Sequence, residues 1–195
     1  MGKKSAIHWA WIILATCFVN LFINYSVRLG YGVVLPEMIK DLGLNRTAGG
    51  TIYNAYLFSY ITLTPLTGYL TDRFGARYVI TTCTFILGAG VFLMGTAGSM
   101  WMACLFYALV GLGATGMWTP IITVVQRWYA ANRRGLALGI LSTGYGLGAI
   151  LVHWVSGILR DTSGNYDQAF IINAVIAALG LALICLVKKG NSLAL

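Results

Sequence analysis

The sequence predicts an all-α membrane protein built from six transmembrane helices. Of its 195 residues, 58% are hydrophobic and only 9% are charged, whereas water-soluble domains are about 45–50% apolar and about 25% charged. The apolar runs are helix-length, about 20 residues each, and are unlike the short alternating strands of a membrane barrel. The lipid bilayer is therefore the first partner that we expect.

Six such runs follow one another, joined by short loops. A first run begins at Trp9 behind two lysines, and the clearest turn, "DTSGNYD", separates the last two runs. We expect residues 1–195 to form one six-helix bundle with spans at about 9–35, 51–71, 78–97, 101–125, 135–159 and 168–187.

All four cysteines lie inside these runs, at Cys17, Cys83, Cys104 and Cys185. Cysteines in such places are expected to be small buried hydrophobic residues rather than disulfide or metal-binding groups. We expect no metal and no other cofactor.

The basic residues indicate the orientation in the membrane. Nine lie in loops or tails on the side that holds both termini, and three lie on the opposite side. The first group is Lys3, Lys4, Arg73, Arg77, Arg127, Arg133, Arg134, Lys188 and Lys189; the second is Lys40, Arg46 and Arg160. By the positive-inside rule, both termini of this multi-pass protein of the cell (inner) membrane are expected in the cytoplasm. The net charge of +8 is thus explained by topology, and we expect no nucleic-acid partner.

A small charged loop, "GYLTDRFGARYV", lies between the second and third runs on the cytoplasmic side. Its pattern is G-x-L-x-D-R-x-G-x-R, formed by Gly68, Asp72, Arg73, Gly75 and Arg77. The first glycine is expected to allow a close helix contact and the second a tight turn. The arginines would hold the loop at the inner surface, and the aspartate would need a partner. The alternative is a basic turn that only sets topology.

This loop, the six spans and the cytoplasmic termini resemble the N-terminal half of the major facilitator superfamily, the 12-helix secondary transporters. The stretch "RWYAANRRGLALGILSTGYGLG" is similar to the fifth helix of organic-anion branches: anion:cation symporters, oxalate/formate antiporters and monocarboxylate porters. It contains the pairs Gly135/Gly139 and Gly144/Gly148, whose spacing permits close backbone packing. Packing alone is a sufficient explanation for these glycines, so they say little about the substrate.

The resemblance has two implications. In that family Asp72 would help to latch the two halves in the outward-facing state, as part of a gating loop. The substrate site would lie at the midplane between two six-helix halves. A second half, as a separate chain or a missing segment, is therefore the expected protein partner.

The first span carries a polar stripe. Asn20, Asn24 and Arg28 are spaced i, i+4 and i+8 and share a face, which Tyr31 extends. Arg28 is the only basic residue inside a span, and its planar guanidinium suits a carboxylate. "NYSVR" also resembles the N-Y-x-x-R of anion:cation symporters, where the arginine lies in the substrate path. The alternative is that Arg28 snorkels to the outer headgroups.

The other spans offer further candidates. A row of tyrosines in the second span could bind an anion or simply pack between helices: Tyr53, Tyr56 and Tyr60. The fourth span offers Tyr107, Thr115 and Trp118, and the fifth offers Ser142, Tyr145 and His153. His153 is a possible proton site, although lone membrane histidines are more often structural. Many superfamily members have an arginine where this chain has Tyr107, and no span carries a deep carboxylate.

The sequence thus predicts secondary transport of a small organic anion of carboxylate type by alternating access. The substrate-binding candidates are Arg28, Asn24, Asn20, Tyr53, Tyr56 and Tyr60. No enzyme activity is expected, because we find no nucleophile constellation, metal cluster or phosphate-binding loop. The alternative is a truncated, transport-inactive membrane fragment or interaction partner.

Overall fold

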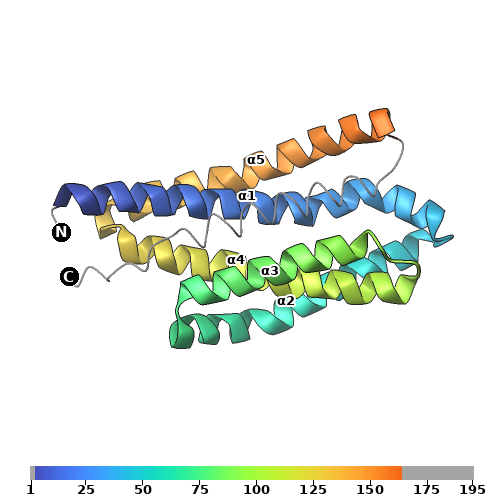
Figure 1. Ribbon diagram of the computed structural model, residues 1–195, viewed down its shortest axis with the longest axis horizontal. Helices are drawn as coiled ribbons and strands as arrows, with labels where there is room; N and C mark the ends of the chain where they lie inside the picture. Colours follow the sequence, from blue (N-terminus) through green and yellow to red (C-terminus); the bar gives the residue numbers. More distant parts are fainter. Residues whose placement is uncertain (1–2, 164–195) are drawn as a thin grey trace.

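A computed structural model describes residues 3–163, which form five α-helices in sequence order (Figure 1). The helices are α1 (Lys3–Asp41), α2 (Arg46–Phe74), α3 (Ala76–Met94), α4 (Met100–Trp128) and α5 (Ala131–Ser163). No strand occurs within the described residues, so the predicted all-α class is confirmed. The expected span at 168–187 lies outside them.

Most helices extend beyond the apolar stretch expected from the sequence. The exception is α3, which ends at Met94 rather than near residue 97, because the chain turns there at Gly95. Two helices begin at side chains that cap them: Asn45 Oδ1 accepts a hydrogen bond of 2.8 Å from the Ala48 amide, and Ser99 Oγ accepts one of 3.4 Å from the Met102 amide. Such caps satisfy amide groups that have no partner inside the helix.

Three stretches of the described chain are long and apolar enough to cross a membrane: Trp9–Gly32 in α1, Ala76–Met94 in α3 and Met100–Trp128 in α4. Helices α2 and α5 are longer than 20 residues but carry more polar side chains. A membrane helix places such side chains inside the bundle or along a water-filled path rather than against lipid.

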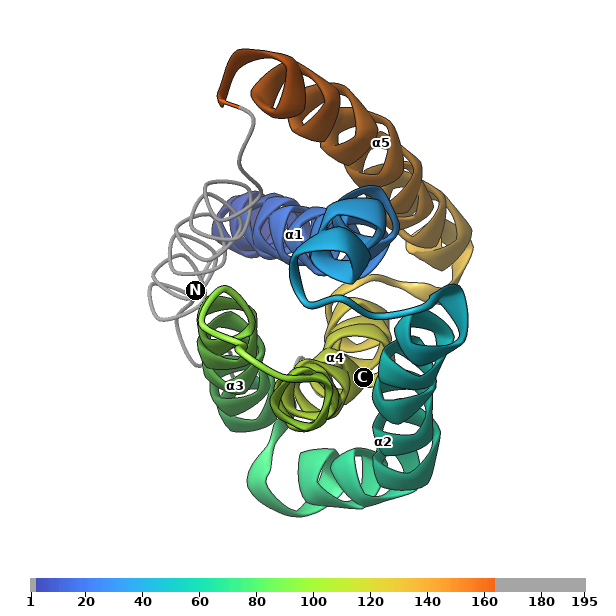
Figure 2. The ribbon, with the colours of Figure 1, turned by 90° about the vertical axis from the view of Figure 1, so that its right-hand side faces the viewer.

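Helices α2 and α3 pack against α4, and α5 packs against α1. The most extensive contacts are those of α4 with α3 and with α2, and those of α1 with α5. In Figure 1, α1 and α5 lie above α2, α3 and α4, and the end view of Figure 2 shows α3 and α2 on either side of α4. The core between them holds fully buried apolar side chains, among them Ile13, Leu21, Leu87, Ile121 and Leu141.

Glycines determine how closely the central helix approaches its neighbours. A Cβ at Gly113 would lie 2.6 Å from Leu87 Cβ and 2.7 Å from the Cys83 carbonyl oxygen on α3. At the other interface, a Cβ at Gly148 of α5 would lie 2.7 Å from the Phe22 carbonyl oxygen of α1. Real Cβ atoms do not approach so closely, so α4 and α5 can take these positions only with glycine there.

Three glycines expected at close contacts have no such role in the described part of the chain. A Cβ at Gly68, Gly135 or Gly139 would meet no atom within 4 Å there. The expected close contact is therefore not found for these three within the described residues, because sequence spacing shows which glycines share a face but not which neighbour that face meets. The pair Gly144/Gly148 does meet a neighbour, at Phe18 and Phe22 of α1.

The charged loop forms a tight turn between α2 and α3. Gly75 has a φ of +91° and ψ of 143°, and its amide donates a 3.0 Å hydrogen bond to the Thr71 carbonyl. The turn prediction for Gly75 is thus confirmed. Arg73 Nη1 donates to the Tyr69 hydroxyl at 3.1 Å, and Asp72 is exposed, with no hydrogen bond or ion pair within the described residues.

Replacing Gly75 with alanine is expected to lower the free energy of unfolding by about 1–3 kcal/mol, because a side chain at this φ is strained. Thermal unfolding of the purified protein in detergent would measure the loss. Gly68→Ala is the matched control: it lies inside α2 with free space at its Cβ, and alanine favours the helix. Equal melting temperatures for the two variants would contradict the strained turn.

Candidate functional site

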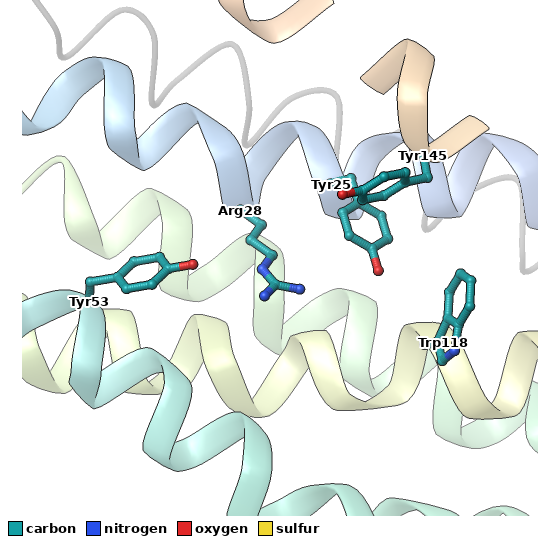
Figure 3. Close-up of a pocket in the computed structure, with 5 residues that line it drawn as sticks. All are labelled: Tyr25, Arg28, Tyr53, Trp118 and Tyr145. Atoms are coloured by element: carbon teal, nitrogen blue, oxygen red, sulfur yellow. The ribbon is translucent and has the colours of Figure 1, made fainter. Parts of the chain in front are cut away.

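A cavity of about 280 Å³ opens between four of the helices. Its lining consists of Tyr25 and Arg28 of α1, Tyr53 of α2, Trp118 of α4 and Tyr145 of α5. Figure 3 shows Arg28 extending from α1 between Tyr53 on one side and Tyr25, Tyr145 and Trp118 on the other. Ligand pockets are about 300–1,000 Å³, so this cavity lies just below the small end of that range.

Aromatic rings surround the charge of Arg28. Its guanidinium carbon lies 5.9 Å from the ring centroid of Tyr25, 5.8 Å from that of Tyr56 and 5.7 Å from that of Tyr60. Cation–π contacts of this kind contribute about 0.5–1 kcal/mol each at exposed sites and more where water is excluded. The rings therefore hold the cation in place without neutralising it.

No carboxylate neutralises Arg28 within the described part of the chain. The one acidic side chain described there is Asp72, which lies in the last turn of α2. A charged side chain within a span costs about 2.5–3.5 kcal/mol on insertion scales. Among the described side chains, the guanidinium of Arg28 therefore has aromatic neighbours but no acidic one.

Stacked tyrosines of α1, α2 and α4 pack beside Arg28. Tyr107 of α4 lies 4.4 Å from Tyr31 and 5.0 Å from Tyr56, measured between ring centroids, and Tyr53 stacks on Tyr56 at 5.9 Å. The Tyr107 hydroxyl donates to the Arg28 carbonyl oxygen at 3.5 Å, and the Tyr31 hydroxyl donates to the Gly49 carbonyl at 2.9 Å. These contacts join α1, α2 and α4 beside Arg28.

The structure separates the residues that the sequence grouped as substrate-binding. Arg28 and Tyr53 line the cavity, whereas Tyr56 and Tyr60 contact the arginine. Asn20 and Asn24 are 1% and 5% exposed and are not among the lining residues. His153 lies on α5, but its side chain is outside the part described.

The two asparagines have unusual surroundings. Asn20 Nδ2 donates to the Thr16 carbonyl at 3.0 Å, while Asn20 Oδ1 and Asn24 Nδ2 are buried and have no hydrogen-bond partner among the described residues. The hydroxyl of Tyr56 is also buried and has no hydrogen-bond partner among the described residues. Buried polar atoms normally have partners, so these three atoms are exceptions within the described part of the chain.

Tyr25 is the lining residue that sequence reasoning missed. Its ring lies 4.2 Å from that of Tyr145 and 6.5 Å from that of Trp118, both in edge-to-face geometry. The available signal was its position three residues before Arg28, on the same side of a helix. Trp118 of α4 and Tyr145 of α5 were candidates from the sequence, but the sequence did not show that both rings contact Tyr25 of α1.

The cavity is lined by hydrogen-bond donors and one positive charge. It presents one cation, three phenol hydroxyls and one indole N–H. Within the described side chains, no group of three histidine, cysteine, aspartate or glutamate residues could hold a metal ion.

The protein-family sequence model described as Major Facilitator Superfamily matches residues 17–192 of the chain. The chain belongs to the major facilitator superfamily. It is 26% identical over 182 residues to a probable hexose phosphate transport protein of Chlamydia pneumoniae, with 93% of this chain and 40% of that protein covered. It is 30% identical over 170 residues to monocarboxylate transporter 9 of Mus musculus, with 86% and 33% covered.

A third relative is the probable sulfoacetate transporter SauU of Cupriavidus necator, 26% identical over 89% of this chain and 40% of that protein. This superfamily chain thus spans about 40% or less of the length of these relatives. Its fold is similar to that of a bacterial homologue of the human lysosomal transporter Spinster, solved inward-facing and unoccupied. The TM-score is 0.83 at 17% identity, over 98% of this chain and 45% of the other.

These findings confirm the family and the fold. The chain has the fold of the N-terminal half of a major facilitator transporter, and it is an integral membrane protein that crosses the bilayer several times.

Proposed function

We propose that this chain forms the N-terminal half of a secondary transporter for a small organic anion, with Arg28 as the group that binds the charge. The observation that carries the proposal is a guanidinium in a small aromatic cavity with no acidic neighbour among the described side chains. The relatives are named for hexose phosphate, sulfoacetate and monocarboxylate, which are all anions.

Transport would proceed by alternating access, in which two six-helix halves rock about a central site. The loop of Gly68, Asp72, Arg73, Gly75 and Arg77 would serve as the gate on this half. Its aspartate is exposed and has no partner within the described residues, which agrees with a partner in a second half. Whether that half is a separate chain or a further segment, the transporter would need it.

Uptake by proteoliposomes tests the proposal. The chain would be reconstituted alone and together with a second six-helix half, and accumulation of ¹⁴C-labelled acetate or benzoate would be followed. Saturable uptake that requires Arg28 is the expected result in the assembled transporter. Uptake in neither preparation would favour the alternative, a transport-inactive fragment or interaction partner.

The proposed orientation places the α2–α3 and α4–α5 links in the cytoplasm of the cell, beneath the inner membrane. Figure 1 shows both links at the same end of the bundle as the start of α1. In a variant without native cysteines, Asn132→Cys should resist a membrane-impermeant maleimide in intact cells, and Thr47→Cys should react. Both positions are exposed. The reverse labelling pattern would contradict the orientation.

A further inference from the structure

We infer that the cavity selects a monoanion with a flat apolar body, such as an aromatic carboxylate, over polyhydroxylated or doubly charged anions. This inference rests on the function proposed above and concerns the same cavity. Its basis is the unequal distribution of polar and aromatic groups along the cavity.

Arg28 lies between Tyr53 on one side of the cavity and three aromatic rings on the other (Figure 3). Arg28 contacts Tyr25, and the ring of Tyr25 packs edge-to-face with those of Tyr145 and Trp118. These three rings line the cavity on one side of the guanidinium (Figure 3). A ligand whose carboxylate meets Arg28 therefore extends its body along these rings. Aromatic rings prefer offset or edge-to-face partners, which a flat apolar ring provides.

Two of these rings have free surface in the described part of the chain. Trp118 is 37% exposed and Tyr145 is 46% exposed, although both contact Tyr25. A stacked ligand would cover this aromatic surface. The described lining residues include no amide or carboxylate side chain, so only the three phenol hydroxyls, the indole N–H and Arg28 could hydrogen-bond the several hydroxyls of a sugar body.

The charge of the ligand is limited by the same geometry. Arg28 is the single cationic side chain among the lining residues. One guanidinium fork pairs with one carboxylate through two parallel hydrogen bonds. A second negative charge would face the negatively polarised faces of the tyrosine rings, where no cation compensates it.

Four probe anions distinguish the effect of the ligand's charge from the effect of its flat apolar body. Acetate has the carboxylate alone, benzoate adds a flat ring, glucuronate adds a polyhydroxylated ring, and phenyl phosphate carries about −1.5 to −2 charges at pH 7. Binding of labelled benzoate to the whole chain in detergent would be measured directly, and the others would compete. We expect benzoate to bind at least tenfold more tightly than each of the other three anions, which is about 1.4 kcal/mol.

Substitutions of the aromatic lining residues test whether these rings bind the apolar body of the ligand. Trp118→Ala and Tyr145→Ala should reduce benzoate affinity to that of acetate and leave acetate affinity within about twofold, because acetate does not reach these rings. Trp118→Phe should retain most of the preference. The matched control is Trp101→Ala, since Trp101 lies on the same helix, is 80% exposed and is not among the lining residues.

The outcomes distinguish this inference from the proposed function. Acetate or glucuronate binding as tightly as benzoate, or phenyl phosphate binding more tightly, would overturn the inference and leave anion binding intact. Equal losses of acetate and benzoate in Trp118→Ala would do the same, since the ring would then only support the fold. If none of the four anions binds in an Arg28-dependent way, the proposed function itself fails.

Discussion

Replacing Arg28 with glutamine is expected to weaken anion binding about 100-fold or more and to abolish uptake in the assembled transporter. Hydrogen bonds to charged groups contribute about 1.5–3 kcal/mol each, and the guanidinium offers two in parallel to a carboxylate. Glutamine retains a polar group but neither the charge nor the fork. Direct binding of a labelled carboxylate to the purified chain measures the loss.

The same substitution should change stability little. The three cation–π contacts that would be lost are together of the same order as the cost of about 2.5–3.5 kcal/mol for keeping a charge within a span. Since these terms oppose each other, the melting temperature should remain near that of the unmodified protein. Loss of binding with unchanged stability is therefore the signature of a binding residue.

Two further variants sharpen the test. Arg28→Lys keeps the charge but loses the planar fork, so an intermediate loss of about tenfold is expected. Arg46→Gln removes an exposed charge at the start of α2, away from the cavity lining, and should bind as the unmodified protein does. Normal binding by Arg28→Gln would rule out Arg28 as the anion-binding group, and a large loss in Arg46→Gln would indicate a long-range effect of net charge.

Gly113→Ala is expected to lower the free energy of unfolding by about 1–3 kcal/mol. The new methyl group would meet the α3 backbone, including the Leu87 amide nitrogen and the Cys83 carbonyl oxygen at 2.7 Å. Neither atom can rotate away as a flexible side chain would, so α3 and α4 must separate. Thermal unfolding in detergent provides the measurement.

The control for this substitution is Gly139→Ala in α5. Its Cβ would meet nothing within 4 Å in the described part of the chain, and alanine favours a helix over glycine by about 1 kcal/mol. Stability should therefore stay the same or rise. A stable Gly113→Ala variant would contradict the close contact of α3 with α4.

Much of the fold could be predicted from the sequence. Apolar runs of helix length identify the membrane class, and the glycine in the D-R-x-G-x-R loop identified the turn that Gly75 makes. The boundaries were less certain, since a helix continues past the apolar core of the bilayer. Hydrophobicity reports the edge of that core, whereas caps such as Asn45 and Ser99 decide where the helix begins.

The candidate site could be predicted only in part. Arg28 was evident, because one basic residue within an apolar span is costly and needs a reason. Asn20, Asn24 and Arg28 do not face the same surroundings in the structure. Residues four apart differ by about 40° around the helix axis, so Arg28 lies about 80° around the axis from Asn20. The asparagines are buried, and the arginine faces the cavity.

The sequence by itself determined the membrane class, the tight turn at Gly75 and the single basic residue within the apolar stretch of α1, since each depends on composition or on neighbours along the chain. Only the tertiary structure decided which rings surround that cation and which glycines bring helices together. Tyr25, Trp118 and Tyr145 come from three helices, and Gly148 meets a neighbour where Gly139 does not. Helical periodicity defines the face of each helix, but the packing of helices decides what that face contacts.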